Sequence, residues 1–194
     1  MNPDKRTQIL STAKKRFERF GFNKTTVDEI AKDVGISKRT LYQGFGKKEE
    51  ILEELFMFEA LSVRKAILNQ IKKVKEPKEK LETYLKLVKK YFDKNPFICN
   101  VLNDQSGFFR PFLKDKPHVV EEGIEEIIVN ILKEGMSKGV FRKMDEQIIG
   151  YSIFLLCKGF TYGKQKSDDQ FRVSQISQLI NFVIEGILTD KPKH

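Results

Sequence analysis

Residues 37–40 bring together side chains that can recognise a polyanion. Ser37 and Thr40 carry hydroxyl groups. Lys38 and Arg39, between them, carry positive charges. Cationic side chains bind phosphates, and short polar side chains can reach the edges of bases. The four residues are therefore a candidate nucleic-acid-binding segment, provided that a rigid element presents them.

The surrounding residues have the anatomy of a helix-turn-helix. Thr26 and Glu29 have the spacing of a capping box and predict a helix start. Gly35 ends this helix and suits the left-handed backbone of a turn. Ser37 caps a second short helix, and Ala31 provides the small side chain needed where the helices meet. The apolar residues expected beneath the second helix are Ile36, Leu41 and Phe45. An ordinary helical corner with a glycine turn is the alternative interpretation.

A longer pattern extends beyond this motif. Residues 9–52 read IL-x-x-A-x-x-x-F and then G-F-x-x-T-T-V-x-x-I-A-x-x-x-G-I-S-x-x-T-L-Y-x-x-F-x-x-K-E-E-I-L. This segment resembles the DNA-binding domain of TetR/AcrR-type regulators. The resemblance implies a three-helix DNA-binding domain and a larger helical body whose last two helices pair in a dimer. It also implies a regulator, most often a repressor, that a small-molecule effector releases from its operator.

The resemblance implies roles for individual residues. Lys38, Arg39 and Thr40 would lie in the major groove, with Arg39 as the best candidate for a bidentate contact to guanine. A solvated or phosphate-only Arg39 is the alternative. Backbone phosphates would be held at the helix N-terminus and by neighbouring side chains. The candidate DNA-binding residues are Thr26, Ser37, Lys38, Arg39, Thr40, Tyr42, Gln43 and Lys48.

The rest of the chain predicts an all-α fold of about nine helices, because apolar residues repeat at helical spacing and no stretch alternates as a strand. In the helix that follows Asn2 and Pro3, the inward residues are expected to include Phe17 and Phe20. Residues 97–116 are expected to be irregular. The predicted domains are a helix-turn-helix DNA-binding domain over 1–47 and an effector-binding and dimerisation domain over 48–194.

A dimer is expected because one recognition helix reads only a few base pairs of a palindromic double-stranded operator. The apolar stripe of residues 173–187, with apolar residues of the preceding helix, could form a four-helix interface across a twofold axis. Packing of both helices in the core of one chain is the alternative. The candidate interface residues are Ile149, Ile153, Leu156, Ile176, Ile180, Val183, Ile184 and Ile187.

Aromatic residues are frequent in the C-terminal domain, which suits a cavity for a small apolar or amphipathic ligand. Ordinary core packing explains the same residues equally well. The candidate pocket residues are Tyr84, Phe92, Phe108, Phe109, Phe112, Tyr151 and Phe154. No cofactor is expected. A DNA-binding regulator without a small-molecule effector, controlled by a partner or by abundance, is the alternative function.

The composition suits a DNA-binding protein, and a merely basic cytosolic protein whose lysines solvate helix faces explains the charge equally well. The net charge is +9, and residues 1–50 hold twelve Lys and Arg residues against seven Asp and Glu residues. The two cysteines, Cys99 and Cys157, lie in apolar surroundings and predict free thiols rather than a disulfide or metal site. The sequence lacks H-E-x-x-H and phosphate-loop motifs. Residues 135–139 spell G-x-S-x-G, but they end a predicted helix instead of joining a strand to a helix, so an enzyme is not expected. No apolar run could span a bilayer, so we expect a cytosolic protein without membrane contacts.

Overall fold

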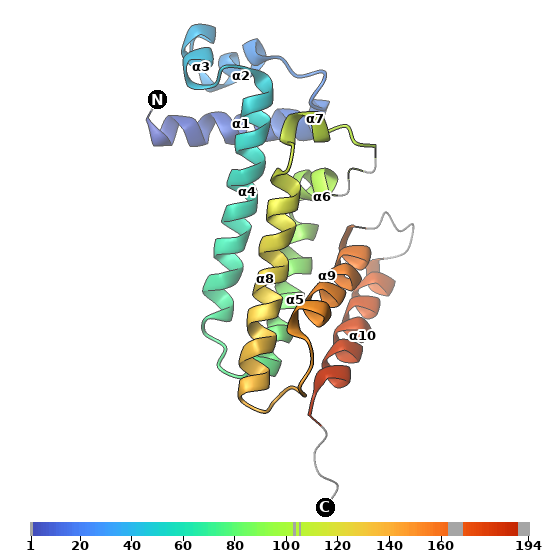
Figure 1. Ribbon diagram of the computed structural model, residues 1–194. Helices are drawn as coiled ribbons and strands as arrows, with labels where there is room; N and C mark the ends of the chain where they lie inside the picture. Colours follow the sequence, from blue (N-terminus) through green and yellow to red (C-terminus); the bar gives the residue numbers. More distant parts are fainter. Residues whose placement is uncertain (1, 103, 105, 163–168, 190–194) are drawn as a thin grey trace, which may run out of the picture. The chain divides into compact units, whose positions relative to one another are not determined.

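The predicted all-α fold is confirmed in a computed structural model that describes residues 2–102, 104, 106–162 and 169–189. Side chains of residues 160–176 lie outside this description. The described residues form no strand, and an isolated bridge joins Phe141 to Leu188. Ten helices run in the order α1 (Pro3–Phe20), α2 (Val27–Val34), α3 (Lys38–Gly44), α4 (Lys48–Ile71), α5 (Pro77–Asp93), α6 (Pro96–Leu102), α7 (Arg110–Leu113), α8 (Lys116–Ser137), α9 (Glu146–Tyr162) and α10 (Asp169–Ile187) (Figure 1).

The chain folds into two compact units. The head unit comprises residues 1–62 and 95–117, and the body unit comprises residues 63–94 and 118–194. Helix α4 therefore begins in the head unit and ends in the body unit. The segment 95–117 belongs to the head unit although it follows α5 in sequence. The functional division at residues 47 and 48 stays a prediction.

The head unit begins with α1, whose N-terminus is capped as the sequence predicts. The Asn2 side chain accepts a hydrogen bond from the Asp4 amide at 3.0 Å, and Pro3 opens the helix. Phe17 is buried as expected. The inward position expected for Phe20 is wrong, because its ring is 45% exposed and lies 4.9 Å from the guanidinium carbon of Arg19. At the last residue of the helix, an aromatic ring can thus pack on a cation instead of the core.

Residues 97–116 are not wholly irregular, since they contribute to α6 and contain α7. Asn95 is 6% exposed, and its Oδ1 accepts a hydrogen bond from the Ile98 amide at 3.4 Å. Its Nδ2 donates to Glu59 Oε2 on α4 at 2.6 Å. The same carboxylate pairs with the ammonium of Lys14 on α1 at 2.7 Å. One buried asparagine therefore caps α6 and joins it to two other helices of the head unit.

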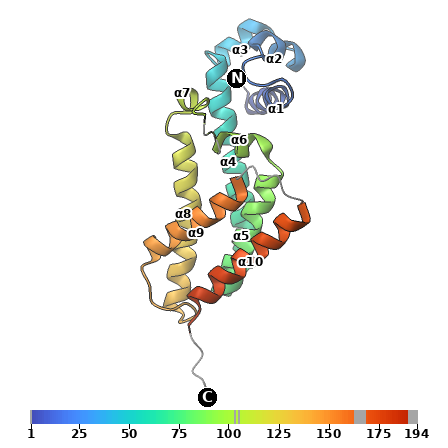
Figure 2. The ribbon, with the colours of Figure 1, turned by 90° about the vertical axis from the view of Figure 1, so that its right-hand side faces the viewer.

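The body unit packs α9 and α10 against α5, as Figures 1 and 2 show from two directions. Two glycines allow close approach within this core. A Cβ built on Gly135 would lie 2.0 Å from the ring of Phe141, and one on Gly150 would lie 2.6 Å from Val129 Cγ2. In the part of the chain that the structure describes, no helix is long and apolar enough to cross a membrane.

Candidate nucleic-acid interface

The predicted helix-turn-helix is formed by α2 and α3, and its turn and caps have the expected geometry. Thr26 Oγ1 accepts a hydrogen bond from the Glu29 amide at 3.3 Å, while the Thr26 amide donates to the Glu29 carboxylate at 2.8 Å. Gly35 ends α2 with φ +72°, in the left-handed region that favours glycine. Ser37 Oγ then accepts from the Thr40 amide at 3.0 Å. Local sequence therefore fixes the angle at which α3 begins.

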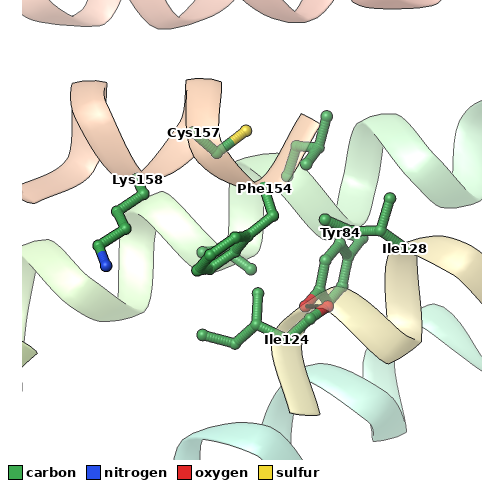
Figure 3. A pocket seen from close by; sticks show the side chains of 8 residues that line it. Tyr84, Ile124, Ile128, Phe154, Cys157 and Lys158 are labelled. Atoms are coloured by element: carbon green, nitrogen blue, oxygen red, sulfur yellow. Dashed lines mark hydrogen bonds between the residues drawn. The ribbon is translucent and has the colours of Figure 1, made fainter. Parts of the chain in front are cut away.

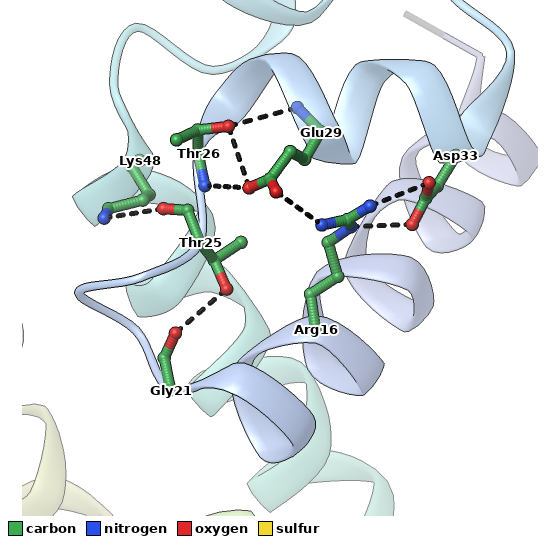
Figure 4. A network of polar contacts seen from close by, with 7 residues as sticks. All are labelled: Arg16, Gly21, Thr25, Thr26, Glu29, Asp33 and Lys48. Carbon is green, nitrogen blue, oxygen red and sulfur yellow. Dashed lines mark hydrogen bonds and ion pairs between the residues drawn. The ribbon is translucent and has the colours of Figure 1, made fainter.

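An arginine on α1 holds α2 in place. Arg16 Nε lies 2.6 Å from Asp33 Oδ2, and Arg16 Nη1 lies 3.2 Å from Glu29 Oε1 (Figure 4). The hydrogen bond from Arg16 lowers the pKa of the Asp33 carboxyl, and hydrogen bonds from Thr26 lower the pKa of Glu29. Glu29 and Asp33 are thus stabilised in their charged form by contacts within the head unit.

The loop before α2 is held by Lys48, which the family resemblance assigns to a phosphate. Its Nζ donates hydrogen bonds to the carbonyl oxygens of Phe22 at 2.8 Å and Thr25 at 2.9 Å. The ammonium also lies 4.3 Å from the centre of the Phe22 ring. Two of the three ammonium hydrogens are therefore committed to the backbone that leads to Thr26, and a phosphate role for Lys48 stays a prediction.

Helix α3 has one buried and one exposed face. Leu41 and Phe45 are 0% and 2% exposed, and together they anchor the helix in the head unit. The opposite face is wholly polar apart from the ring of Tyr42, which is 42% exposed. The structure thus brings most of the predicted DNA-binding side chains to one exposed surface, and we call this set the α3 surface: Lys38, Arg39, Thr40, Tyr42 and Gln43.

The C-terminal end of α3 is fixed by Arg6, a residue that the sequence analysis did not select. Its Nη1 donates to the Gly44 carbonyl oxygen at 3.2 Å, and its guanidinium carbon lies 4.3 Å from the centre of the Phe45 ring. Arg6 also pairs with Glu54 on α4, and this hydrogen bond raises the pKa of the guanidinium. These partners lie 38 and 48 residues away in sequence, so no local pattern indicates them.

The N-terminal end of α3 carries a second contact that sequence reasoning missed. Lys38 Nζ lies 2.8 Å from Asp28 Oδ1, in the first turn of α2. The hydrogen bond to Asp28 raises the pKa of the Lys38 ammonium. A residue of the α3 surface is thus paired with a carboxylate of the neighbouring helix.

The predicted pocket residues do not form one group. Phe108, Phe109 and Phe112 lie in the head unit, where the rings of Phe108 and Phe112 are 6.3 and 5.2 Å from the ring of Phe22. Phe92 is buried on α5 of the body unit. Phe108 and Phe112 therefore pack beside the loop that precedes α2, and the ring of Phe109 packs against that of Phe108.

Two predicted pocket residues, Tyr84 and Phe154, do line one pocket of the body unit (Figure 3). Its volume of ≈ 10 Å³ is about the space that one water molecule needs. The Tyr84 hydroxyl donates to the Ile124 carbonyl oxygen at 3.0 Å, and Lys158 at the pocket pairs with Glu121 at 2.7 Å. Tyr151 is 50% exposed and lies beside Phe154 without lining the pocket.

Cys157 also lines this pocket, and burial raises the pKa of its thiol to about 11. Neither Cys157 nor Cys99 forms a disulfide within the described residues, and both are half-buried. A thiol that stays protonated at neutral pH is a weak nucleophile. Cys157 therefore contributes an unreactive side chain to a pocket wall that is mainly apolar.

The predicted interface residues lie mostly within the core of the body unit. Ile153, Ile180, Val183, Ile184 and Ile187 are buried in the single chain, and Ile149 is half-buried. Ile176 lies outside the described side chains. Leu156 alone of the predicted set is exposed, at 40%. Periodicity selected mainly the inner face of α9 and α10. Their outer faces carry an exposed apolar set that shares Leu156 with the prediction: Ile148, Tyr151, Leu155, Leu156 and Phe182.

A helix-turn-helix with a buried inner face and a basic, polar outer face defines a DNA-binding protein. Residues 9–55 match the family model described as "Bacterial regulatory proteins, tetR family". This match covers about a quarter of the chain and supports the predicted class, a DNA-binding transcriptional regulator of the TetR family in place of an enzyme.

Relatives and solved structures match over nearly the whole chain. An uncharacterized HTH-type transcriptional regulator of Bacillus subtilis, YhgD, is 21% identical, with 96% of this chain and 98% of that protein covered. The nucleoid occlusion factor SlmA of Vibrio atlanticus is 24% identical, with 89% of each protein covered. A transcriptional regulator of Saccharomonospora viridis, solved in complex with choline, has 18% identity and a TM-score of 0.77, with coverage of 97% and 100%.

Proposed function

We propose that this regulator binds a palindromic operator as a homodimer and represses transcription until a small molecule binds its body unit. The observation that carries the DNA-binding part is the division of α3 into a buried apolar face and the exposed α3 surface. A helix whose outer face is polar and basic, and whose inner face is anchored, can enter the major groove without losing its support.

Arg39 is the proposed base-reading residue. It is exposed, and within the described residues its guanidinium makes no hydrogen bond or ion pair. Lys38, by contrast, is paired with Asp28. A guanidinium with all its donors available suits bidentate recognition of guanine.

The outer faces of α9 and α10 are the proposed dimer interface. Phe182 is 71% exposed, Ile148 is 63% exposed and Tyr151 is 50% exposed. Exposed apolar side chains gathered on adjacent helices are typical of a surface that another protein covers. We propose a second copy of the chain as that protein, since a palindromic operator requires twofold symmetry. The buried residues of α9 and α10 pack in the core of the body unit and are not available to a second chain. The proposed interface therefore consists of the exposed apolar residues of these helices, in place of most of the residues expected from the sequence.

The effector proposal rests on the apolar wall of the body-unit pocket and on the choline bound by the regulator from Saccharomonospora viridis. We propose a small apolar or amphipathic ligand that enlarges the pocket beside Tyr84 and Phe154. Such a ligand releases DNA only if it binds the state of low DNA affinity more tightly.

A regulator without a small-molecule effector is the second candidate. The described pocket has space for about one water molecule, and the chain is also similar to a nucleoid occlusion factor. Screening small apolar and cationic compounds for a shift in melting temperature distinguishes the two. A shift accompanied by loss of operator binding supports an effector, and a screen without any such compound favours control by a partner or by abundance.

The DNA-binding proposal is tested by titrating the protein against a palindromic fragment from upstream of its own gene and against scrambled DNA. Arg39→Ala should weaken operator binding by ~1–3 kcal/mol and leave scrambled binding nearly unchanged. Arg142→Ala removes an exposed arginine of the body unit and should change neither. Equal losses on both DNAs would make Arg39 a phosphate contact, and equal wild-type affinity for both would reject this operator.

The dimer proposal is tested by Phe182→Glu, which places a carboxylate in the apolar surface. Analytical ultracentrifugation should show a dimer for the wild type and a monomer for the variant. Phe20→Glu makes the same change at an exposed phenylalanine of the head unit and should leave the dimer intact. A Phe182→Glu protein that remains dimeric would place the interface elsewhere.

A further inference from the structure

Asp28 and Lys38 form an ion pair that joins the starts of the two helices of the helix-turn-helix. The Lys38 ammonium lies 2.8 Å from Oδ1 and 2.9 Å from Oδ2 of Asp28. Both side chains are more than half exposed. The ammonium also lies 5.9 Å from the centre of the Tyr42 ring. An acidic side chain therefore lies directly beside the α3 surface.

This position distinguishes Asp28 from the other acidic residues of α2. Glu29 closes the capping box and pairs with Arg16, and Asp33 also pairs with Arg16. Those two carboxylates tie α2 to α1. Asp28 makes its ion pair with a residue of the α3 surface instead, so its charge acts where a DNA ligand would approach.

A carboxylate at this place has opposite effects on two kinds of complex. Binding to random DNA depends on attraction between cations and phosphates, so Asp28 weakens it by repelling phosphates and by occupying Lys38. An ammonium has three hydrogens, however, and one can remain with Asp28 while another reaches a base acceptor. A complex that keeps Lys38 in this orientation retains the ion pair, so it loses less from the carboxylate than a complex with random DNA does. An exposed pair is also weak enough to exchange for phosphates when DNA has no matching base.

We propose that Asp28 is a positioning residue that sets sequence specificity: it orients the Lys38 ammonium toward base edges and suppresses binding to random DNA. This inference rests on the proposed use of the α3 surface in DNA binding. The hydrogen bond to Asp28 raises the pKa of the Lys38 ammonium further above the neutral range, so Lys38 keeps its charge under the conditions of DNA binding.

Asp28→Asn tests the inference through its effect on two DNAs. Binding to scrambled DNA should strengthen by about threefold to tenfold, and its log–log salt slope should steepen by about one. Operator binding should change less, so the ratio of operator to scrambled affinity falls. Unchanged affinity for scrambled DNA, or an equal gain on both DNAs, would overturn the inference.

Asp33→Asn is the matched control, because it removes the same charge from the same helix but from a carboxylate paired with Arg16. If Asp33→Asn lowers the ratio of operator to scrambled affinity as much as Asp28→Asn does, the change in net charge alone explains the loss of specificity. That result would reject a special role for Asp28. In a Lys38→Met background, Asp28→Asn should alter the specificity ratio much less, because only the direct repulsion between Asp28 and phosphates remains to be removed. A full effect of Asp28→Asn in that background would show that Asp28 does not act through Lys38.

Failure of the Asp28 inference can be distinguished from failure of the proposed function. If wild-type protein binds both DNAs equally, the choice of operator fails, yet the comparison of Asp28→Asn with Asp33→Asn on scrambled DNA still tests whether Asp28 suppresses random binding. Melting temperatures of all variants identify loss of folding, and the Lys38→Met pair supplies a comparison in which Asp28 has no partner.

Discussion

The two units of this regulator use glycine for different physical reasons. Gly35 in the head unit has φ +72°, and a Cβ added to it would meet no atom within 4 Å. Gly135 in the body unit has no positive φ, yet an added Cβ would lie 2.0 Å from the ring of Phe141. The first glycine provides a backbone conformation, and the second provides space. The head unit is thus shaped at this turn by local conformation, and the body unit is shaped here by packing between side chains.

The largest expected effect is that of Gly135→Ala. Phe141 is 2% exposed, so its ring cannot move into solvent to admit the new methyl group. Overpacking of this kind should lower the free energy of unfolding by ~1–3 kcal/mol, measured by urea denaturation. Phe141→Leu reduces the ring to a smaller side chain and should recover part of that loss in the double variant. Purely additive losses would show that the contact with Phe141 is not the reason for the glycine.

A smaller loss is expected for Gly35→Ala, since here only the backbone is strained. A left-handed alanine should cost about 1–2 kcal/mol of the free energy of unfolding. Gly35→Asn is the discriminating variant, because asparagine tolerates this conformation and should be milder than alanine. At Gly135, by contrast, asparagine should be worse than alanine because it is larger. If both sites rank alanine and asparagine in the same order, the contrast between conformation and space is wrong.

Acid should have the smallest effect, confined to polar contacts. The pKa values of Glu29 and Asp33 are lowered in the folded head unit, so their contribution to stability is present above the pKa of the unfolded chain. It is lost as pH falls through the lowered values, in the range below about pH 4.5. The melting temperature of the wild type should therefore fall more between pH 6 and pH 3 than that of Glu29→Gln/Asp33→Asn. Equal pH dependence of the two proteins would show that these pairs do not stabilise the head unit.

The same contrast explains how far the sequence predicts the fold. The capping box at Thr26, the turn at Gly35 and the cap at Ser37 each depend on residues within a few positions, and all three are confirmed. The all-α class follows from the apolar period and is confirmed too. The short helices α6 and α7 were not predicted. The start of α6 depends on Asn95, which is buried and donates a hydrogen bond to Glu59 on α4.

Prediction of the candidate site fails where partners are distant in sequence. The α3 surface could be selected from residues 37–43 alone, whereas Arg6 acts on Gly44 and Glu54 far along the chain. Aromatic composition did not separate Phe108 in the head unit from Phe154 in the body unit. Helical periodicity identifies an apolar stripe but not its partner, so the buried Ile180 was chosen and the exposed Phe182 was overlooked.

The anchoring of α3 has a consequence for how operators diverge in evolution. Its support comes from Leu41, Phe45 and the contacts of Arg6, and none of these belongs to the exposed α3 surface. Substitutions at exposed positions such as Arg39 and Gln43 usually change stability by no more than about 0.5 kcal/mol. A duplicated gene can therefore sample new recognition sequences by point mutation while each variant remains folded. Regulators with one scaffold and many operators are the expected result of such a separation.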